Sequence, residues 1–254
     1  MANVTAQTGK VTLRSSQRTL ETWLLRSEQF RINTTLGSLA FRDGWDAFYN
    51  PGDPDSYTLV GTKISALSDL LGNWPDATQS TDNNRPTLDT ATYAIPTALF
   101  AGNQRLQTAS LPNAPISQPF AFSTATLHNG GAAVTSRFIG LDGGSNFVEL
   151  TKGASAYAIN AGSNVFAAPT SLTGLTPIAA TFDGASSRLR VDANNTSGDA
   201  GAYAMTQITI GSRSNSYSAA ATGIVGAVAV RLDGDDDAAW RMAEAIYNAL
   251  NDAL

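Results

Sequence analysis

Short runs of alternating apolar and polar residues dominate the sequence from about residue 41 onward. Nine runs between residues 92 and 234 show this most clearly: TYAIPTALFAG, QPFAFSTATLH, AVTSRFIGLDGG, NFVELTKG, SAYAINAG, TPIAATFDG, SRLRVDAN, MTQITIGS and GIVGAVAVRLDG. Successive side chains of a β-strand point to opposite faces, so this alternation predicts strands. Because turn residues bracket most runs and no helix separates them, the pattern favours an antiparallel sandwich or jelly roll.

Residues 181–192, TFDGASSRLRVD, are typical of a hairpin in this series. Asp183-Gly184 opens the turn between an incoming and an outgoing strand. The alternation predicts one buried face and one charged, solvent-exposed face. We expect the buried set to be Ile178, Ala180, Phe182, Leu189 and Val191, and the exposed set to be Arg188, Arg190 and Asp192.

Two segments have helical spacing instead. The last one, DDDAAWRMAEAIYNALNDAL, predicts a C-terminal helix at 235–253, because Trp240, Ala243 and Leu250 recur on one face. Its three leading aspartates suit the exposed N–H groups of a first helical turn. Near the start of the chain, SQRTLETWLLRSEQF predicts a short helix.

Composition excludes several kinds of site. A chain of 254 residues suffices for one large all-β domain or two small ones. The absence of cysteine and the presence of one histidine exclude disulfides, thiolate nucleophiles and His-rich metal sites. The sequence shows neither a signal-peptide pattern nor an apolar run long enough to span a bilayer, so we expect no membrane association.

Charge is distributed unevenly along the chain. Residues 1–42 hold six basic and two acidic residues, a net charge of +4, whereas the remainder holds ten basic and nineteen acidic residues, a net charge of −9. We therefore expect residues 1–40 to be an attachment or oligomerisation arm that meets an acidic partner or a neighbouring copy. The predicted docking residues are Arg14, Arg18, Trp23, Leu24, Arg26 and Phe30. No dense Lys/Arg cluster is present, so we expect no nucleic-acid binding.

Five segments in the rest of the chain resemble, in this order, concanavalin A-like domains of the LamG type. They are DPDSYTLVGTKISALSDLLGNWPDATQSTDNNRPTL at 53–88, ALFAGNQRL at 98–106, FDGASSRLRV at 182–191, ITIG at 208–211 and GIVGAVAVRL at 223–232. The resemblance implies an all-β, antiparallel two-sheet jelly-roll sandwich over residues 41–254. The N-terminal arm with its short helix and the C-terminal helix flank this sandwich.

Some relatives of such domains are glycosidases, which need two carboxyl groups, ~5–5.5 Å or ~6.5–9.5 Å apart. The resemblance implies that these acids alternate along one strand, but here only Glu149 lies in a predicted strand and no second acid follows at that spacing. We expect no catalytic residue. His128 precedes an Asn-Gly turn and is interpreted as a hairpin-end side chain. The acidic run 233–237 is interpreted as a helix cap, with a Ca²⁺ site as the alternative; we expect no metal and no cofactor.

Aromatic rings beside amides and carboxylates are the arrangement that sugar binding requires, because a flat ring stacks on a pyranose face. The candidate glycan residues are Trp45, Tyr49, Asn50, Trp74 and Asp76. Burial of these aromatic side chains at the edge of the sandwich is the competing interpretation.

A weakly charged, cysteine-free jelly roll with a basic arm fits a non-enzymatic structural component of a bacteriophage virion, such as a capsid decoration, head-fibre or tail protein. In this interpretation the chain is a homo-oligomer on the virion surface. It docks on a major capsid or tail protein and displays a domain that binds host-surface glycans. One alternative is a free carbohydrate-binding module of a secreted or surface protein. A second alternative is a glycan-cleaving enzyme.

Overall fold

The computed structural model describes residues 35–128, 136–141, 148–153, 156–162, 165–169, 174–212 and 220–251. Most of their regular structure is antiparallel β-strand. The strands are β1 (Ala47–Tyr49), β2 (Tyr57–Val60), β3 (Lys63–Leu67), β4 (Ala77–Thr78), β5 (Thr87–Asp89), β6 (Thr97–Ala101), β7 (Leu106–Gln107), β8 (Phe120–His128), β9 (Ser136–Gly140), β10 (Val148–Lys152), β11 (Ala156–Ala161), β12 (Val165–Pro169), β13 (Thr176–Phe182), β14 (Ser187–Val191), β15 (Asn194–Gly198), β16 (Thr209–Ile210) and β17 (Thr222–Arg231). Residues 35–42 are helical, and α3 spans Asp236–Asn251.

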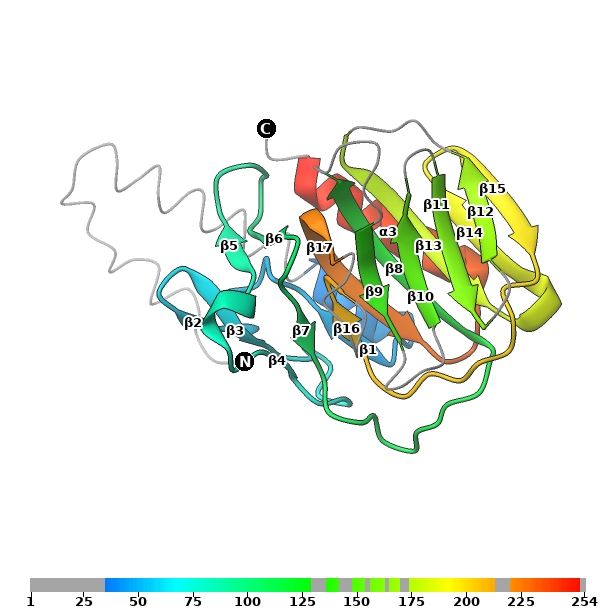
Figure 1. Ribbon diagram of the computed structural model, residues 1–254, viewed down its shortest axis with the longest axis horizontal. Coiled ribbons are helices and arrows are strands. Elements are labelled where there is room, and N and C mark those ends of the chain that lie inside the picture. The colour runs from blue at the N-terminus through cyan, green and yellow to red at the C-terminus, as the bar shows by residue number, and fades with distance from the viewer. Residues whose placement is uncertain are drawn as a thin grey trace, which may run out of the picture.

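The strands form two layers that lie face to face (Figure 1). One layer runs in the order β15-β14-β13-β8-β17, with β6 and β1 following one another along the free edge of β17. The second layer runs in the order β12-β11-β10-β9-β16-β7-β4-β3-β2. Strand β5 pairs with both β6 and β3 and so joins the two layers. The predicted all-β, antiparallel sandwich is confirmed.

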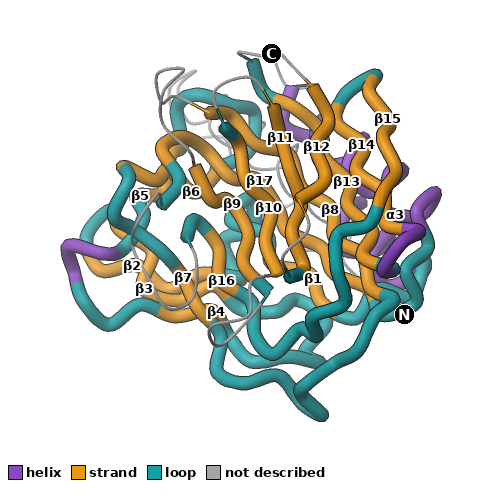
Figure 2. The backbone as a smooth tube through the Cα atoms, turned by 45° about the vertical axis from the view of Figure 1, so that its right-hand side comes forward, coloured by secondary structure: helices purple, strands orange, loops and turns teal. Residues whose placement is uncertain are grey.

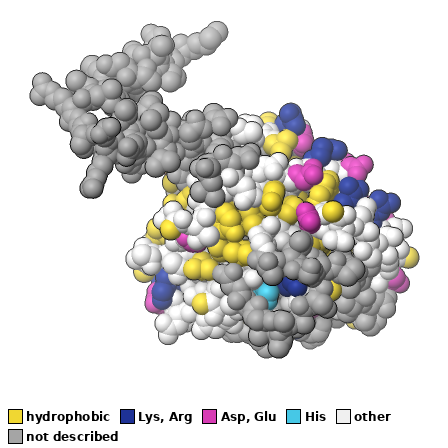
Figure 3. Space-filling view, turned by 90° about the horizontal axis from the view of Figure 1, so that it is seen from above, with side chains coloured by type: hydrophobic (Ala, Val, Ile, Leu, Met, Phe, Trp, Pro, Cys, Tyr) yellow, Lys and Arg dark blue, Asp and Glu magenta, His cyan; other side chains and the backbone are white. Residues whose placement is uncertain are grey.

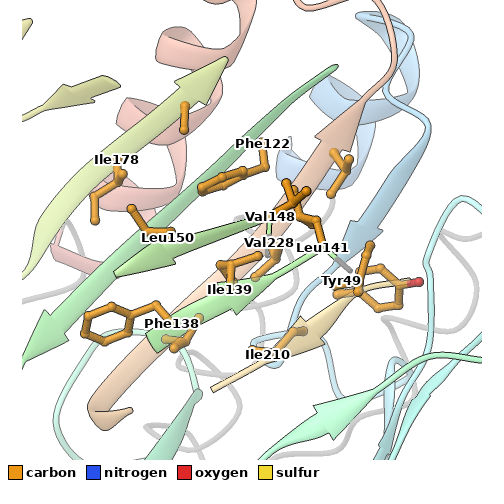
Figure 4. Close-up of a cluster of buried hydrophobic side chains, with 14 of the residues drawn as sticks. Tyr49, Phe122, Phe138, Ile139, Leu141, Val148, Leu150, Ile178, Ile210 and Val228 are labelled. Atoms are coloured by element: carbon orange, nitrogen blue, oxygen red, sulfur yellow. The ribbon is translucent and has the colours of Figure 1, made fainter. Parts of the chain in front are cut away.

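The main core fills the space between the layers. Figure 4 shows Phe122, Ile178 and Val228 of the first layer facing Ile139, Leu150 and Ile210 of the second. All six side chains are at most 1% exposed. Burial of an aliphatic or aromatic side chain contributes about 1.5–3 kcal/mol, so alternation along each strand is sufficient to hold the layers together.

A second core lies on the outer face of the first layer, where α3 covers β8, β13 and β17 (Figure 2). This sheet face is lined by small side chains, which let the helix approach closely: Ala121, Ala125, Ala179, Ala227 and Ala229. The Ser123 hydroxyl donates a hydrogen bond of 2.6 Å to the carbonyl of Ala239. At Gly226 a Cβ would lie 2.8 Å from Leu250, so the position has no room for a side chain.

The predicted C-terminal helix is confirmed: the prediction was 235–253, and α3 spans Asp236–Asn251. The carboxylate of Asp235 accepts the N–H of Ala238 at 3.0 Å, as predicted for a cap. The short helix predicted within SQRTLETWLLRSEQF lies outside the described residues. Leu36 and Ala40, which fall in the range predicted as the arm, are buried in the second core.

Among the described residues, no helix combines the length and the apolar character needed to cross a bilayer.

Candidate functional site

An open polar cavity of about 330 Å³ lies at one end of the sandwich, where the β13–β14 hairpin meets the start of α3. The hairpin supplies Thr181, Asp183, Ser186 and Arg188, and the helix start supplies Gly234, Asp235, Asp236 and Asp237. The hairpin turn is a single 3-10 turn at Gly184–Ser186. Within it the Ser187 hydroxyl accepts the N–H of Asp183 at 2.9 Å and donates to the carbonyl of Gly184 at 2.7 Å. The turn is therefore held by its own polar groups.

Ion pairs join the hairpin to the start of the helix beside this cavity. Arg190 pairs with Asp236 and with Asp237, the latter at 2.8 Å. Arg188 reaches Asp236 at 3.4 Å, but half of the Arg188 side chain stays exposed. The strand face that carries these arginines was predicted to be solvent-exposed, and this holds for Arg188. The Arg190 side chain is only 18% exposed, because the first turn of α3 covers it.

Two side chains at the cavity are left to interact with a ligand. The Asp183 carboxylate and the Ser186 hydroxyl are exposed, and neither makes a hydrogen bond to another described residue. A carboxylate accepts hydrogen bonds, a hydroxyl both donates and accepts, and the exposed guanidinium of Arg188 donates. Together the three groups match the donor and acceptor pattern of neighbouring hydroxyls on a sugar.

An exposed aromatic ring lies on the loop next to the cavity. Gln118 connects the two loops: its Oε1 accepts the N–H of Gly184 at 2.6 Å, and its Nε2 donates to the carbonyls of Gly201 and Tyr203, each at 3.1 Å. Tyr203 is 38% exposed, and its ring lies over Gly162, where a Cβ would be 3.5 Å from the ring. Gln118 thus ties the loop of Tyr203 to the hairpin turn, and the Tyr203 ring keeps exposed surface.

Three of the predicted glycan residues are buried. Trp45, Tyr49 and Asn50 are 4%, 0% and 1% exposed, so none of them presents a ring face or an amide to solvent. The Tyr49 hydroxyl donates to the carbonyl of Pro75 at 2.7 Å, and burial raises the pKa of this phenol far above its usual range. The guanidinium of Arg231 lies 5.4 Å from the Trp45 ring centre. These residues hold the loops around β1 in place.

The other two predicted glycan residues, Trp74 and Asp76, keep exposed surface. Trp74 is half-buried against the main core, and Asp76 is exposed. The structure does not bring them to the polar cavity, whose lining contains neither residue. Their role in sugar binding stays a prediction.

The predicted docking residues of the arm all lie outside the described residues: Arg14, Arg18, Trp23, Leu24, Arg26 and Phe30. Arm docking, homo-oligomer formation and the division of the chain at residues 40 and 41 stay predictions.

The strand glutamate and the acidic run are both engaged by arginines. Glu149 is 4% exposed and pairs with Arg137 at 3.1 Å on β9. In the acidic run, Asp233 pairs with Arg231, and this hydrogen bond lowers the pKa of the Asp233 carboxyl below its usual value. Within the described ranges, no three acidic or histidine side chains are grouped so that they could hold a metal ion.

Comparison with known proteins gives the fold. No protein-family model matches the chain, and no curated protein sequence matches it. Solved structures are similar to the chain at low sequence identity, among them the following three. The chain is similar to the sialidase of Trypanosoma rangeli in complex with sialic acid, with a TM-score of 0.54, 15% identity, and coverage of 82% of this chain and 33% of that one. It thus spans about a third of the length of the sialidase.

The second structure is domain 4 of a GH43 extracellular arabinanase from Geobacillus stearothermophilus, in complex with arabinotriose. The match has a TM-score of 0.51 at 12% identity and covers 78% of this chain and 98% of that domain. The third is a GH54 α-L-arabinofuranosidase soaked with a cyclic sulfate inhibitor, with a TM-score of 0.57, 14% identity, and coverage of 82% and 60%. The chain is thus a β-sandwich of a kind found in glycoside hydrolases. The likeness shows the fold alone.

The prediction of a non-enzymatic virion component is wrong. The similar structures come from a sialidase, an arabinanase and an arabinofuranosidase, and none of these three supports a capsid, head-fibre or tail role. All three names are those of glycoside hydrolases, so the fold gives no reason to exclude catalysis either. Weak charge and a basic arm were poor guides to function, because surface composition reflects solubility and association rather than the identity of a site.

Sequence reasoning missed Gln118, Tyr203 and the cavity itself. Gln118 is separated from Tyr203 by 85 residues, so no local pattern connects them. Asp183 was interpreted as opening the hairpin turn and Arg188 as part of its exposed face, and Ser186 was assigned no role. The usable signal was the coincidence of a charged hairpin with a second charged segment at 233–237, since opposite charges of this kind meet in folded proteins.

Proposed function

We propose that this chain is a carbohydrate-binding protein and that the polar cavity between the β13–β14 hairpin and α3 is its sugar site. Asp183, Ser186 and Arg188 bind the hydroxyl groups of one sugar residue. Tyr203 supplies the face on which a neighbouring sugar ring stacks. We also propose that the domain that carries this site is of the LamG type, as the order of the sequence segments indicates.

The observation that carries the proposal is the pair of exposed polar side chains, Asp183 and Ser186, that have no hydrogen-bond partner among the described residues of an open cavity. The fold adds support, because the match that covers nearly the whole of another domain is to one in complex with arabinotriose. Specific sugar sites combine a few fixed polar groups with an apolar or aromatic surface, as this end of the sandwich does.

The test is titration calorimetry of the full chain with arabinotriose, preceded by a glycan array that identifies better ligands. The double variant Asp183→Asn/Ser186→Ala is expected to weaken binding at least tenfold, which corresponds to about 1.4 kcal/mol. Tyr203→Ala is expected to weaken the binding of longer oligosaccharides more than the binding of monosaccharides, because it removes the ring on which a neighbouring sugar unit stacks. Asp192→Asn, which changes an exposed carboxyl outside the cavity lining, is the matched control.

Binding that survives the double variant unchanged would place the sugar elsewhere. Loss of binding in Trp74→Ala or Asp76→Asn would then favour the predicted loop. An array without any signal would reject carbohydrate binding altogether. Chromatography of each mixture for shortened oligosaccharides shows whether bound glycan is also cleaved, and cleavage that depends on Asp183 would make the cavity an active site rather than a binding site alone.

A further inference from the structure

A second group of polar side chains lies between the two layers at the opposite end of the sandwich. It is formed by Lys152 at the end of β10, Tyr157 near the start of β11 and His128 at the end of β8. The polar cavity adjoins the start of β8, so the eight residue steps of this strand separate the two regions by roughly 25 Å. The inference below is therefore independent of the proposed sugar site.

Lys152 is a buried cation without a described counter-charge. It is 4% exposed, its ammonium donates to the carbonyl of Gly153 at 3.0 Å, and it lies 5.3 Å from the centre of the Tyr157 ring. An ammonium group has three donors, and a carbonyl and a ring face satisfy them poorly. No described carboxylate forms an ion pair with it, and burial alone lowers the pKa of Lys152.

The neighbouring polar groups are not acidic either. The Tyr157 hydroxyl lies 3.3 Å from the Thr126 hydroxyl, and burial raises the pKa of this phenol, so it stays protonated and uncharged. The sequence that directly continues β8 and β10, residues 129–135 and 154–155, contains no Asp or Glu. A buried positive charge of this kind lowers the stability of the fold unless an anion compensates it.

His128 lies close enough to Lys152 to feel its charge and supplies a second nitrogen. Its Nδ1 atom is buried and has no hydrogen-bond partner among the described residues, while its ring packs edge-on against Phe138 at 6.2 Å between centres. Burial, and after it the charge of Lys152, lower the pKa of His128, and a hydrogen bond with the backbone of Thr222 opposes this. The one histidine of the chain is seen at the surface when this end is viewed from above, coloured cyan in Figure 3.

We propose that Lys152 and His128 form a binding site for a compact oxyanion, a carboxylate or a sulfate group. The ammonium of Lys152 donates to one oxygen of the anion and Nδ1 of His128 to another. Binding favours the protonated imidazole, so it is coupled to uptake of one proton and strengthens as the pH falls toward the pKa of His128. The anion is either free in solution or carried by an acidic sugar.

The single histidine makes the test direct, because its ring protons give one resolved set of NMR signals. The full chain is titrated with sodium sulfate, sodium acetate and sodium glucuronate at constant ionic strength, with sodium chloride as the reference. We expect saturable shifts of the His128 signals and a rise of its pKa of about half a unit or more in the presence of the anion. Glucuronate binding at least tenfold tighter than acetate identifies an acidic sugar; equal affinities identify a free anion.

Lys152→Met is expected to weaken anion binding at least tenfold and to leave the His128 pKa insensitive to anions. Lys152→Arg, which keeps the charge, is expected to retain the response. Lys63→Met, at a partly exposed lysine paired with Asp82, is the control. Should Lys152→Met fail to fold, the wild-type titration decides alone. Shifts that rise linearly, equal those in chloride or persist in Lys152→Met overturn the proposal.

Discussion

One buried carboxylate, that of Asp69, organises the loop between β3 and β4 at the edge of the sandwich. Asp69 is 7% exposed and accepts four backbone N–H groups, from Phe48, Leu71, Asn73 and Trp74, at 2.8–3.1 Å. Each of these donors would otherwise need another partner or water. Residues 69–73, DLLGN, belong to the segment 53–88 that resembles LamG-type domains, and the hydrogen bonds of Asp69 give this stretch a local structural role.

Asp69→Asn tests this role. Asparagine has one acceptor oxygen where aspartate has two, and its NH₂ group would face N–H donors, so at least two of the four bonds are lost. We expect the free energy of unfolding in urea to fall by about 2–4 kcal/mol, as for buried groups that lose charge-assisted hydrogen bonds. Asp192→Asn, at an exposed site, should change it by less than ~0.5 kcal/mol. A loss for Asp69→Asn no larger than this would contradict the role.

At the scale of elements, the helical residues 35–42 and α3 act as one covering layer. The side chains of Leu36 and Ala40 enter the same core as Met242 and Ile246 of α3. The opposite side of the first helical segment is open, and Phe41 there is 81% exposed. Leu36 and Ala40, which fall within the predicted arm, thus pack on the same sheet face as α3.

Leu36→Ala and Phe41→Ala separate these two faces of the segment. Leu36→Ala should lower the free energy of unfolding by about 2–4 kcal/mol, because it removes a buried side chain and leaves a cavity. Phe41→Ala should change it by less than ~0.5 kcal/mol, since the ring contributes little burial. Urea unfolding followed by tryptophan fluorescence measures both. Equal effects of the two substitutions would show that residues 35–42 do not pack on the sandwich in solution.

At the scale of the whole molecule, the two candidate sites lie at opposite ends of the sandwich. One end carries the hairpin arginines and the aspartates of α3, and the other carries Lys152 and His128. The middle is held by apolar packing between the layers. Changes of pH should therefore act on the ends before they act on the core.

Two groups with lowered pKa values, one at each end of the sandwich, contribute to the pH dependence of stability. The pKa of His128 is lowered from 6.5 by burial, so its contribution to stability is present above 6.5 and is lost as the pH falls through the folded value. The pKa of Asp233 is lowered from 3.8 by the hydrogen bond from Arg231, so its contribution is lost below pH 3.8. We expect two declines in the free energy of unfolding on acidification.

Urea unfolding at pH values from 8 to 3 measures the profile. His128→Asn should reduce the decline in the free energy of unfolding near pH 6 and leave the decline below pH 3.8 unchanged. Asp233→Asn should reduce the decline below pH 3.8 and leave the decline near pH 6 unchanged. A stability that rises on acidification between pH 7 and 5 would contradict the environment described for His128.

The local spacing of apolar residues, period two in the hairpin and helical in the last segment, was sufficient to predict both elements. Ile178, Ala180 and Phe182 are all buried in the main core, as expected from period-two spacing. Strand β15, with the sequence NNTSG, and strand β12 were not predicted. β15 has no apolar side chain to signal its position and is held by pairing with β14, which is a tertiary effect.

The sequence by itself determined the class of fold, the buried faces of the predicted strands and the capped helix, because these depend on the spacing of residues a few positions apart. Only the tertiary structure decided the sites. It buried Trp45, Tyr49 and Asn50. It also brought Asp183 and Asp235, some fifty residues apart in the sequence, to the lining of one cavity. Lys152 was left buried without a described counter-charge. Alternation specifies which face of a strand is buried, but the pairing of distant strands specifies which polar groups meet.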